Sequence, residues 1–215
     1  MSESTLIRPI PPELRSERGW TVHVDGDRLE SVAVVIIEHP HYGKLSYGLT
    51  PHGYDGWVFA EARGGVGLLV HVELDGELFV VVVEQDRPNQ GGFVLNIPRG
   101  FIDLDEDPLT AARRELKEET GLELAAERFV QLPGAPGNPN SAFFDTRGPD
   151  TGVRFYAVRL EPAELPGQSW ARPSGGEQIR CARLVPWFEL AGFADMVGNA
   201  GLARLLASRR RGAAG

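Results

Sequence analysis

The sequence has very little cysteine: Cys181 is the single one among 215 residues. An internal disulfide framework is therefore excluded, and one free thiol is typical of a protein in the reducing cytoplasm. The longest apolar runs, Val32 to Ile37 and Leu78 to Val83, are far shorter than the roughly 20 residues that a membrane-spanning helix needs. Residues 1–15 mix charge with proline and lack the apolar segment of a secretory signal peptide. We expect a cytoplasmic protein with no membrane partner.

Basic residues are also scarce. The 22 Lys and Arg residues are outnumbered by 30 Asp and Glu residues, which gives a formal net charge of -8 at pH 7. Nucleic-acid-binding proteins cluster Lys and Arg against phosphates. The basic run Arg209 to Arg211 lies close to the end of the sequence, where we expect a disordered tail over residues 209–215. The charge balance argues against nucleic acid as the main partner.

Alternating apolar residues and turn dipeptides predict several strands. Asp-Gly pairs predict hairpin turns at residues 25–26 and 75–76. Segments rich in Pro and Gly predict long loops over residues 38–57 and 133–151. The predicted strands comprise residues 20–24, 29–37, 67–73, 78–83, 93–97, 127–132, 153–160 and 179–184.

The clearest helix signal follows Asp107. Asp is a favoured N-cap, Pro108 suits the first helical position, and Gly121 suits a left-handed C-cap. Further helices are predicted over residues 186–196 and 202–209. Hairpins combined with a central and a terminal helix indicate an α+β domain built in layers.

The chemistry-bearing stretch is Gly100 to Leu122, GFIDLDEDPLTAARRELKEETGL. Positions i, i+3 and i+4 share one face of a helix, so Glu115, Glu118 and Glu119 form one acidic patch. Arg114 can pair with Glu118 at i+4, but the remaining carboxylates repel one another. Mg²⁺ prefers such oxygen ligands and would relieve the repulsion. A solvent-exposed acidic helix is the alternative interpretation of the glutamates alone.

The whole stretch matches G-x5-E-x7-R-E-U-x-E-E-x-G-U, with U aliphatic, at every defined position, and thus resembles the box of the Nudix family. The resemblance implies an α+β Nudix fold, with a mixed β-sheet sandwiched between α-helices. It also implies hydrolysis of a nucleoside diphosphate linked to another group, with Mg²⁺ or Mn²⁺ as cofactor.

The resemblance implies roles for the matching residues. Glu115 and Glu119 would be direct metal ligands, and Glu118 would be a ligand or hold a metal-bound water. Arg99 would offer its backbone carbonyl to a metal. The loop would be fixed by the catalytic Arg114 through ion pairing, and by Gly100, Glu106 and Gly121.

Two carboxylates are candidates for the general base. Glu177, before the strand predicted at residue 179, resembles the base of ADP-ribose pyrophosphatases, although it could be a plain turn residue. Glu118 is the second candidate.

The resemblance is closest in character to the ADP-ribose and nucleotide-sugar pyrophosphatases. Residues 1–60 would form a small N-terminal β subdomain and loop used in homodimerisation, and residues 61–208 the catalytic domain. Glu84-Gln85-Asp86-Arg87 resembles a motif whose Arg lines the substrate cleft, although an exposed strand end is an equal alternative for Arg87. Pro136, fifteen residues past Gly121, also fits the group.

One position departs from this group. Relatives often carry Glu four residues before the box glycine, where this sequence has Asn96. Asn lacks that charge, which puts the usual ADP-ribose contacts in doubt. Asn96, Asn138 and Asn140 are candidate substrate-binding residues, the last two being equally suited to turns.

Three functions follow. The first is a diphosphatase acting on ADP-ribose or a nucleotide sugar, a small-molecule nucleotide substrate. The second is a Nudix hydrolase of another substrate, such as a dinucleoside polyphosphate, coenzyme A or an oxidised nucleotide. The third is a non-catalytic domain that senses a nucleotide.

Overall fold

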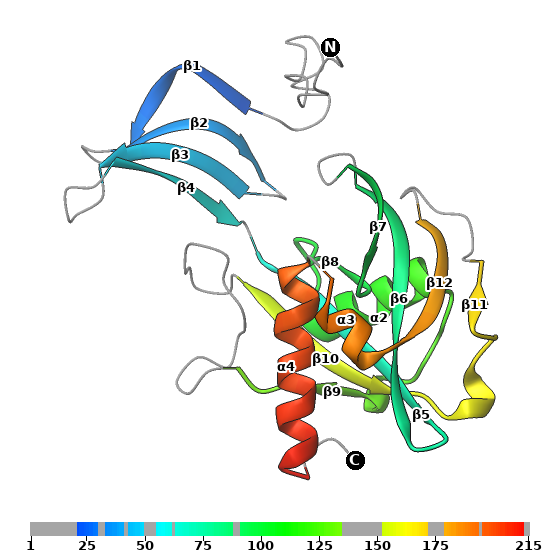
Figure 1. Cartoon of the computed structure of the whole chain (residues 1–215). Coiled ribbons are helices and arrows are strands. Elements are labelled where there is room, and N and C mark those ends of the chain that lie inside the picture. Colours follow the sequence, from blue (N-terminus) through cyan, green and yellow to red (C-terminus); the bar gives the residue numbers. More distant parts are fainter. Residues whose placement is uncertain are drawn as a thin grey trace. The chain divides into compact units, whose positions relative to one another are not determined.

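The computed structural model describes residues 21–29, 33–40, 43–49, 55–61, 63–87, 91–134, 152–171, 179–193 and 195–212. The chain divides into two compact units (Figure 1). The first comprises residues 1–63 and 144–151, and the second comprises residues 64–143 and 152–215. None of the helices in the described ranges has both the length and the hydropathy needed to cross a bilayer.

The first unit contains a four-stranded antiparallel sheet with its strands in sequence order. The strands are β1 (Thr21–Leu29), β2 (Ala33–His39), β3 (Gly43–Leu49) and β4 (Asp55–Glu61). The hairpin turn predicted at Asp25–Gly26 is wrong, because this pair lies inside β1. The register of β1 against β2 shifts between Val22 and Asp27, so the pair occupies an irregular stretch of strand.

The long loop predicted over residues 38–57 is also wrong. Gly43–Leu49 pairs with β2 on one side and with β4 on the other. Hydrogen bonds from two neighbouring strands satisfy the backbone here, and they outweigh the loop-like composition of the segment. The strand predicted over residues 29–37 is divided, since Leu29 ends β1 and β2 begins at Ala33.

The second unit is built on an eight-stranded mixed sheet in the order β11-β12-β6-β5-β10-β9, with β7 beside β6 and β8 beside β5. Only β5 and β10 are parallel; the other neighbours are antiparallel. Its strands are β5 (Gly65–Leu74), β6 (Glu77–Arg87), β7 (Gly92–Asn96), β8 (Arg99–Phe101), β9 (Phe129–Gln131), β10 (Val153–Arg159), β11 (Ser169–Trp170) and β12 (Ile179–Pro186).

The predicted hairpin at residues 75–76 is confirmed: Asp75 and Gly76 join β5 to β6, both with positive φ. β8 and β11 escaped prediction because strands of three and two residues carry no detectable periodicity.

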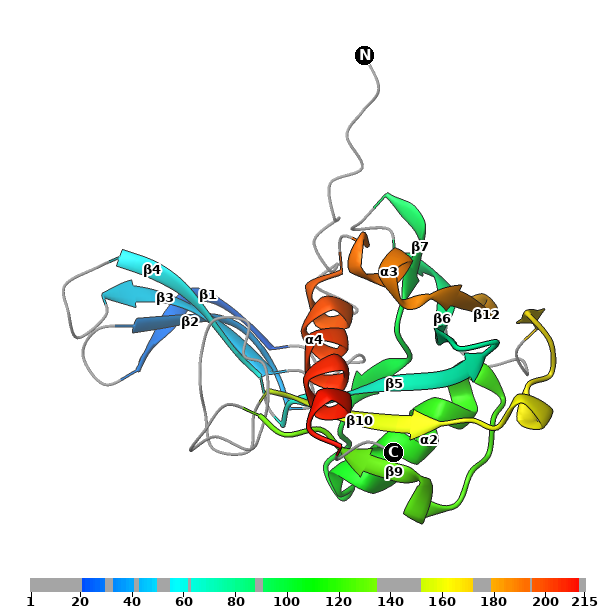
Figure 2. The same cartoon turned by 60° about the horizontal axis from the view of Figure 1, so that its bottom comes forward.

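Helices cover both faces of this sheet (Figures 1 and 2). α2 (Pro108–Thr120) packs over β5, β8 and β12, whereas α4 (Met196–Arg210) packs over β5 and β10, and α3 (Trp187–Ala191) over β6 and β12. Two short 3-10 turns are η2 (Ala126–Arg128) and η3 (Pro162–Glu164). The predicted α+β layering, a mixed sheet between helices, is confirmed.

The apolar core is divided by the sheet into two clusters. On the α2 side, Val66, Leu68 and Val70 of β5 pack with Leu116. On the α4 side, Leu69 packs with a second set of buried residues: Val80, Val82, Phe155, Leu202 and Leu205. Successive β5 side chains point to opposite faces, so both faces of this central strand are buried.

α4 differs from the prediction in extent. The residues between the two predicted helices, including Gly198 and Gly201, lie inside one helix from Met196 to Arg210. Gly201 is required by close packing: a Cβ there would lie 2.5 Å from Leu69 Cδ2. The tail predicted to begin at residue 209 is wrong at its start, because Arg209 and Arg210 are helical and Arg209 pairs with Glu73.

Candidate active site on α2

The local sequence fixes α2 at both ends. Asp107 accepts hydrogen bonds from the N–H groups of Leu109 at 2.9 Å and Thr110 at 3.2 Å, and the helix begins at Pro108. At the other end Gly121 has φ 75°, and its N–H donates to the carbonyl of Lys117. Both predicted caps are confirmed, so the register of every side chain on α2 is set locally.

The three glutamates are buried to very different degrees. Ala111, Ala112 and Leu116 face the sheet and are fully buried. Glu119 is 1% exposed and Glu115 is 6% exposed. The Glu118 side chain is 57% exposed. A buried carboxylate must be compensated by hydrogen bonds or opposite charge. Glu115 and Glu119 therefore require partners that a solvated helix face would not.

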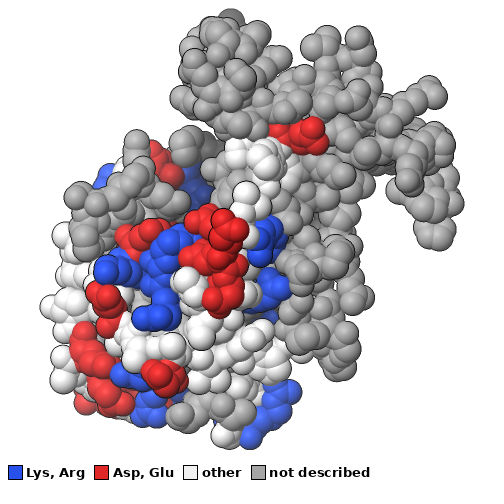
Figure 3. Space-filling view, turned by 180° about the vertical axis from the view of Figure 1, so that it is seen from behind, with Lys and Arg blue, Asp and Glu red and all other residues white. Residues whose placement is uncertain are grey.

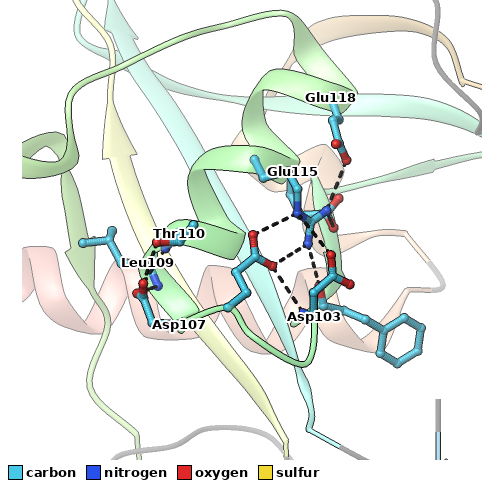
Figure 4. A network of polar contacts seen from close by, with 9 residues as sticks. Asp103, Asp107, Leu109, Thr110, Glu115 and Glu118 are labelled. Atoms are coloured by element: carbon cyan, nitrogen blue, oxygen red, sulfur yellow. Dashed lines mark hydrogen bonds and ion pairs between the residues drawn. The ribbon is translucent and has the colours of Figure 1, made fainter. Parts of the chain in front are cut away.

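The Arg114 guanidinium is a charged partner of Glu115, in the polar network drawn around Glu115 and Glu118 in Figure 4. Its Nε and Nη2 donate to the two oxygens of Glu106 at 3.0 and 2.9 Å. Its Nη1 donates to Glu115 Oε1 at 2.6 Å and to Glu118 Oε2 at 3.1 Å, the i,i+4 pair expected from the sequence. Nη2 also donates to the backbone carbonyl of Phe101 at 2.9 Å. One side chain thus holds two of the glutamates and the preceding loop.

This geometry keeps the network charged. Hydrogen bonding to Glu106, together with the nearby charge of Glu115, raises the pKa of Arg114. Burial of Glu106 opposes its ionisation, but the hydrogen bonds from Arg114 and from the Asp103 N–H outweigh burial and lower its pKa. Glu106 is therefore a carboxylate at neutral pH.

Gly100 brings the loop backbone against the helix. A Cβ at this position would lie 1.9 Å from Glu115 Oε1 and 2.1 Å from its carboxyl carbon. Atoms that are not bonded to each other cannot approach so closely, so any side chain at residue 100 would displace the Glu115 carboxylate. The box glycine is explained by this contact.

Glu119 is held from a different direction. The backbone N–H of Arg99 donates to Glu119 Oε2 at 2.8 Å. The Arg99 side chain turns to Asp195, with 2.7 Å between Nη1 and Oδ1. Sequence reasoning missed Asp195, which lies 96 residues further along the chain. The available signal was an Asp before a helix, but the predicted helix over residues 186–196 placed Asp195 inside a helix. That prediction is wrong, because α3 ends at Ala191 and Asp195 is the N-cap of α4.

The last turn of α2 has a further partner on β11. The Trp170 indole N–H donates to the backbone carbonyl of Thr120 at 2.7 Å. The Thr120 hydroxyl donates to the Leu116 carbonyl at 2.6 Å and accepts from the Leu122 N–H at 3.1 Å. Trp170 was also missed, because a two-residue strand gave no reason to place it near the helix.

Charges of both signs lie side by side on the face of the second unit seen from behind in Figure 3. Within its described part, Asp and Glu alternate with Lys and Arg over short distances. Such mixing of the two signs on this face is typical of a surface of paired charges.

Residues 62–207 match the family model of the NUDIX domain. The chain belongs to the Nudix family. Among curated proteins, Nudix hydrolase 14, chloroplastic, of Arabidopsis thaliana is 38% identical over 149 residues, which cover 60% of this chain and 44% of that protein. ADP-sugar pyrophosphatase of Mus musculus is 52% identical over 42 residues, which cover 20% of this chain and 19% of that protein.

Among solved structures, a Caenorhabditis elegans Ap4A hydrolase in a binary complex has a TM-score of 0.46 and 17% identity, covering 70% of this chain and 98% of that one. The chain spans less than half the length of the first curated relatives that it matches.

Two of the four substrate-binding candidates of this Nudix chain, Arg87 and Asn96, lie within the described residues. Arg87 ends β6, and Asn96 ends β7 opposite Val83. Val83 faces α2, and directly opposed residues share one face of a sheet, so Asn96 also faces α2. Asn96 is 1% exposed, and neither atom of its amide has a hydrogen-bond partner within the described part of the chain. Glu177, Asn138, Asn140 and Pro136 lie outside the described residues.

The metal expected of a Nudix box can be compared with the donors present. Within the described ranges, no three His, Cys, Asp or Glu side chains converge as a ready-made metal cluster. Glu115 and Glu118 converge on Arg114 instead, and Glu119 turns to the Arg99 N–H. The donor chemistry nevertheless fits a hard cation, since carboxylate oxygens lie against a loop backbone that has no Cβ at Gly100.

Proposed function

We propose that this chain hydrolyses the diphosphate linkage of a nucleoside diphosphate derivative, with Mg²⁺ or Mn²⁺ held by α2. The observation that carries the proposal is the Arg114 fork, which joins Glu115 and Glu118 to the loop at Glu106. A buried carboxylate needs hydrogen bonds or an opposite charge, and the fork supplies both to Glu115.

In this proposal each carboxylate has a role. Glu115 and Glu119, both buried, are the direct ligands, and the exposed Glu118 is a further ligand or holds a water. The Arg99 carbonyl completes the donor set. When bound, the divalent cations supply neutralisation of the diphosphate and lower the pKa of the attacking water. Arg114 keeps the loop and helix in register throughout.

A carboxylate must accept the proton of the attacking water. Glu177 is the first candidate for this base, and Glu118 is the second because its side chain is exposed and hence open to a substrate. Near-normal activity of Glu177→Gln across a pH range would remove Glu177 from this role.

ADP-ribose or a nucleotide sugar is the proposed substrate class. Arg87, which follows the Glu-Gln-Asp sequence of β6, and the buried amide of Asn96 are the proposed contacts, together with Asn138 and Asn140. The similarity to an ADP-sugar pyrophosphatase supports this choice, although it spans only 42 residues. We also propose that residues 1–60 form a dimerisation subdomain, which a monomer in light scattering would refute.

The test is a substrate panel with Mg²⁺ that includes ADP-ribose, nucleotide sugars, a dinucleoside polyphosphate, coenzyme A and an oxidised nucleotide. Release of AMP or UMP from the first two, lost in Glu119→Gln, supports the proposal. Hydrolysis confined to the others supports the second function. If nothing is cut and Glu119→Gln binds nucleotide as tightly as wild type, the chain is a sensor.

A further inference from the structure

Arg99 connects the two helices that cover opposite faces of the sheet. Its backbone N–H donates to Glu119 of α2, and its guanidinium contacts Asp195 at the start of α4. β8, on which Arg99 lies, is itself held in the sheet by pairing with β5 at Gly67. The backbone contact with Glu119 therefore does not depend on where the guanidinium points.

Asp195 is fixed independently of Arg99. As the N-cap of α4 it accepts hydrogen bonds from the N–H groups of Val197 at 3.3 Å and Gly198 at 3.2 Å. The N-terminus of a helix stabilises a carboxylate both by these hydrogen bonds and through the helix dipole. Asp195 is thus a fixed anion, and the longer Arg99 side chain is the partner that depends on it.

The ion pair is largely removed from water. The Arg99 side chain is 18% exposed and that of Asp195 is 8% exposed. Removal of one partner of such a pair leaves an uncompensated charge, which must find another partner or be hydrated. Strand pairing with Gly67 directs the Arg99 side chain to the α4 face, and the one carboxylate of the acidic patch recorded against this residue is Glu119, which accepts from its backbone N–H.

We propose that Asp195 is a positioning residue that holds the Arg99 guanidinium away from the acidic patch of α2. With Asp195 in place, one cation of the loop is neutralised on the α4 side, and the glutamates remain available to a divalent cation. Without it, the guanidinium competes with the divalent cation for the same carboxylates. This inference rests on the proposed function, since it assigns those glutamates as cation ligands.

The test measures Mn²⁺ affinity by electron paramagnetic resonance of free Mn²⁺, on the full chain without substrate. Asp195→Asn removes the charge but keeps a good N-cap, and Asp195→Ser is a second capping variant. We expect about 10-fold weaker Mn²⁺ binding in both, at the lower end of the effects typical of residues that support metal ligands.

The decisive variant is the double substitution Asp195→Asn with Arg99→Met. It removes the released guanidinium and keeps the backbone N–H, so Mn²⁺ affinity should return close to that of wild type. A merely structural role of Asp195 would give no such rescue, because the double variant would bind as weakly as Asp195→Asn or more weakly.

Glu164→Gln is the matched control. It removes an ion pair in which Arg128 donates twice to Glu164 at 2.9 Å, and it shares no residue with the Arg99 contacts. Its Mn²⁺ affinity should be unchanged. Wild-type affinity in the Asp195 variants, or no rescue in the double variant, would overturn the inference alone. Absence of Mn²⁺ binding in wild type would overturn the proposed function and this inference with it.

Discussion

α2 and α4 both begin at an aspartate N-cap and both pack on β5, yet their surfaces differ in kind. α2 buries two alanines and a leucine against the sheet and carries buried carboxylates beside them. α4 buries Gly198 and Gly201 together with Leu202 and Leu205. One helix is held by a network of charges, and the other by close contact with apolar side chains.

The difference between the two helices distinguishes residues proposed to act in catalysis from residues that stabilise the fold. A carboxylate buried on a helix costs folding free energy unless it is compensated, and on α2 the Arg114 guanidinium and the Arg99 N–H compensate Glu115 and Glu119. The close contacts of α4 fill the core and need no further explanation. We therefore expect substitutions on α2 to reduce activity in a folded protein, and substitutions on the buried face of α4 to reduce stability.

The largest expected effect is on turnover in Glu119→Gln or Glu115→Gln. As proposed direct ligands, they should lower kcat by more than the roughly 10- to 100-fold typical of residues that only support a ligand. Circular dichroism and thermal unfolding should remain near wild type. If the variants lose their fold instead, the acidic face is structural and the contrast between the helices disappears.

Two glycine substitutions, one beside α2 and one on α4, test whether the α2 face affects activity and the α4 face affects stability. In Gly201→Ala the new methyl group would meet Leu69 and Phe155, and overpacking should cost about 1–3 kcal/mol of unfolding free energy in urea. Its kcat should change little. In Gly100→Ala the methyl group displaces Glu115, so kcat should fall. The free energy of unfolding should fall less than it does in Gly201→Ala. Equal losses of stability in both variants would contradict the assignment of the two faces.

A smaller effect on activity is expected from Arg114→Lys. Lys keeps the positive charge but cannot donate to Glu106, Glu115 and Phe101 at once, as the guanidinium fork does. We expect about a 10-fold loss of kcat/KM for the best substrate of the panel. Unchanged kinetics would show that the charge at residue 114, and not the fork, holds the loop.

The smallest effect is the pH dependence of the free energy of unfolding, which has different origins on the α4 face and the α2 face of the sheet. Burial lowers the pKa of His71 below 6.5, the hydrogen bond to the Leu69 carbonyl opposes this, and the cations Arg209 and Arg159 lower it further. Unfolding releases the ring to take up a proton. Stability should therefore fall as pH drops below 6.5, by at most about 1.4 kcal/mol per pH unit.

On the α2 side, the lowered pKa of Glu106 contributes stability that is present above pH 4.5 and is lost below it. Urea unfolding of His71→Leu should accordingly show a flatter profile between about pH 6.5 and 5, where an unperturbed His gains its proton. Glu106→Gln should alter the profile only at lower pH. A wild-type slope in His71→Leu would refute the assignment to His71.

The elements that the sequence predicted well are those with local signals. α2 has its caps at Asp107 and Gly121, within the reach of one helical turn from the groups that they satisfy, and the turn at Asp75–Gly76 needs only its two neighbouring strands. The same dipeptide failed at Asp25–Gly26 because the pairing of β1 with β2 decided the outcome. Local propensity is a weak guide wherever a partner strand satisfies the backbone.

The candidate site divides in the same way. The spacing of Glu115, Glu118 and Glu119 is a property of the helix, so their common face could be read directly. The Arg99–Asp195 pair and the Trp170–Thr120 hydrogen bond join segments 96 and 50 residues apart. Such contacts depend on how the strands between them are ordered, and nothing in the local sequence specifies that order. The depth of burial of Glu119 was likewise set by the sheet.

The hydrogen bond between Trp170 and Thr120 makes the indole an optical reporter of the end of α2 that carries Glu119. Thr120 follows Glu119 directly, so the indole N–H donates to the residue next to that carboxylate, and a bound cation would change the electrostatic field there. Indole emission responds to such fields, whereas Trp187 stacks edge-on with Phe188 on α3, where it packs with the cluster on the other side of the sheet. Titration of divalent cations can therefore be followed without a label, with Trp170→Phe as a reference that keeps Trp20, Trp57 and Trp187.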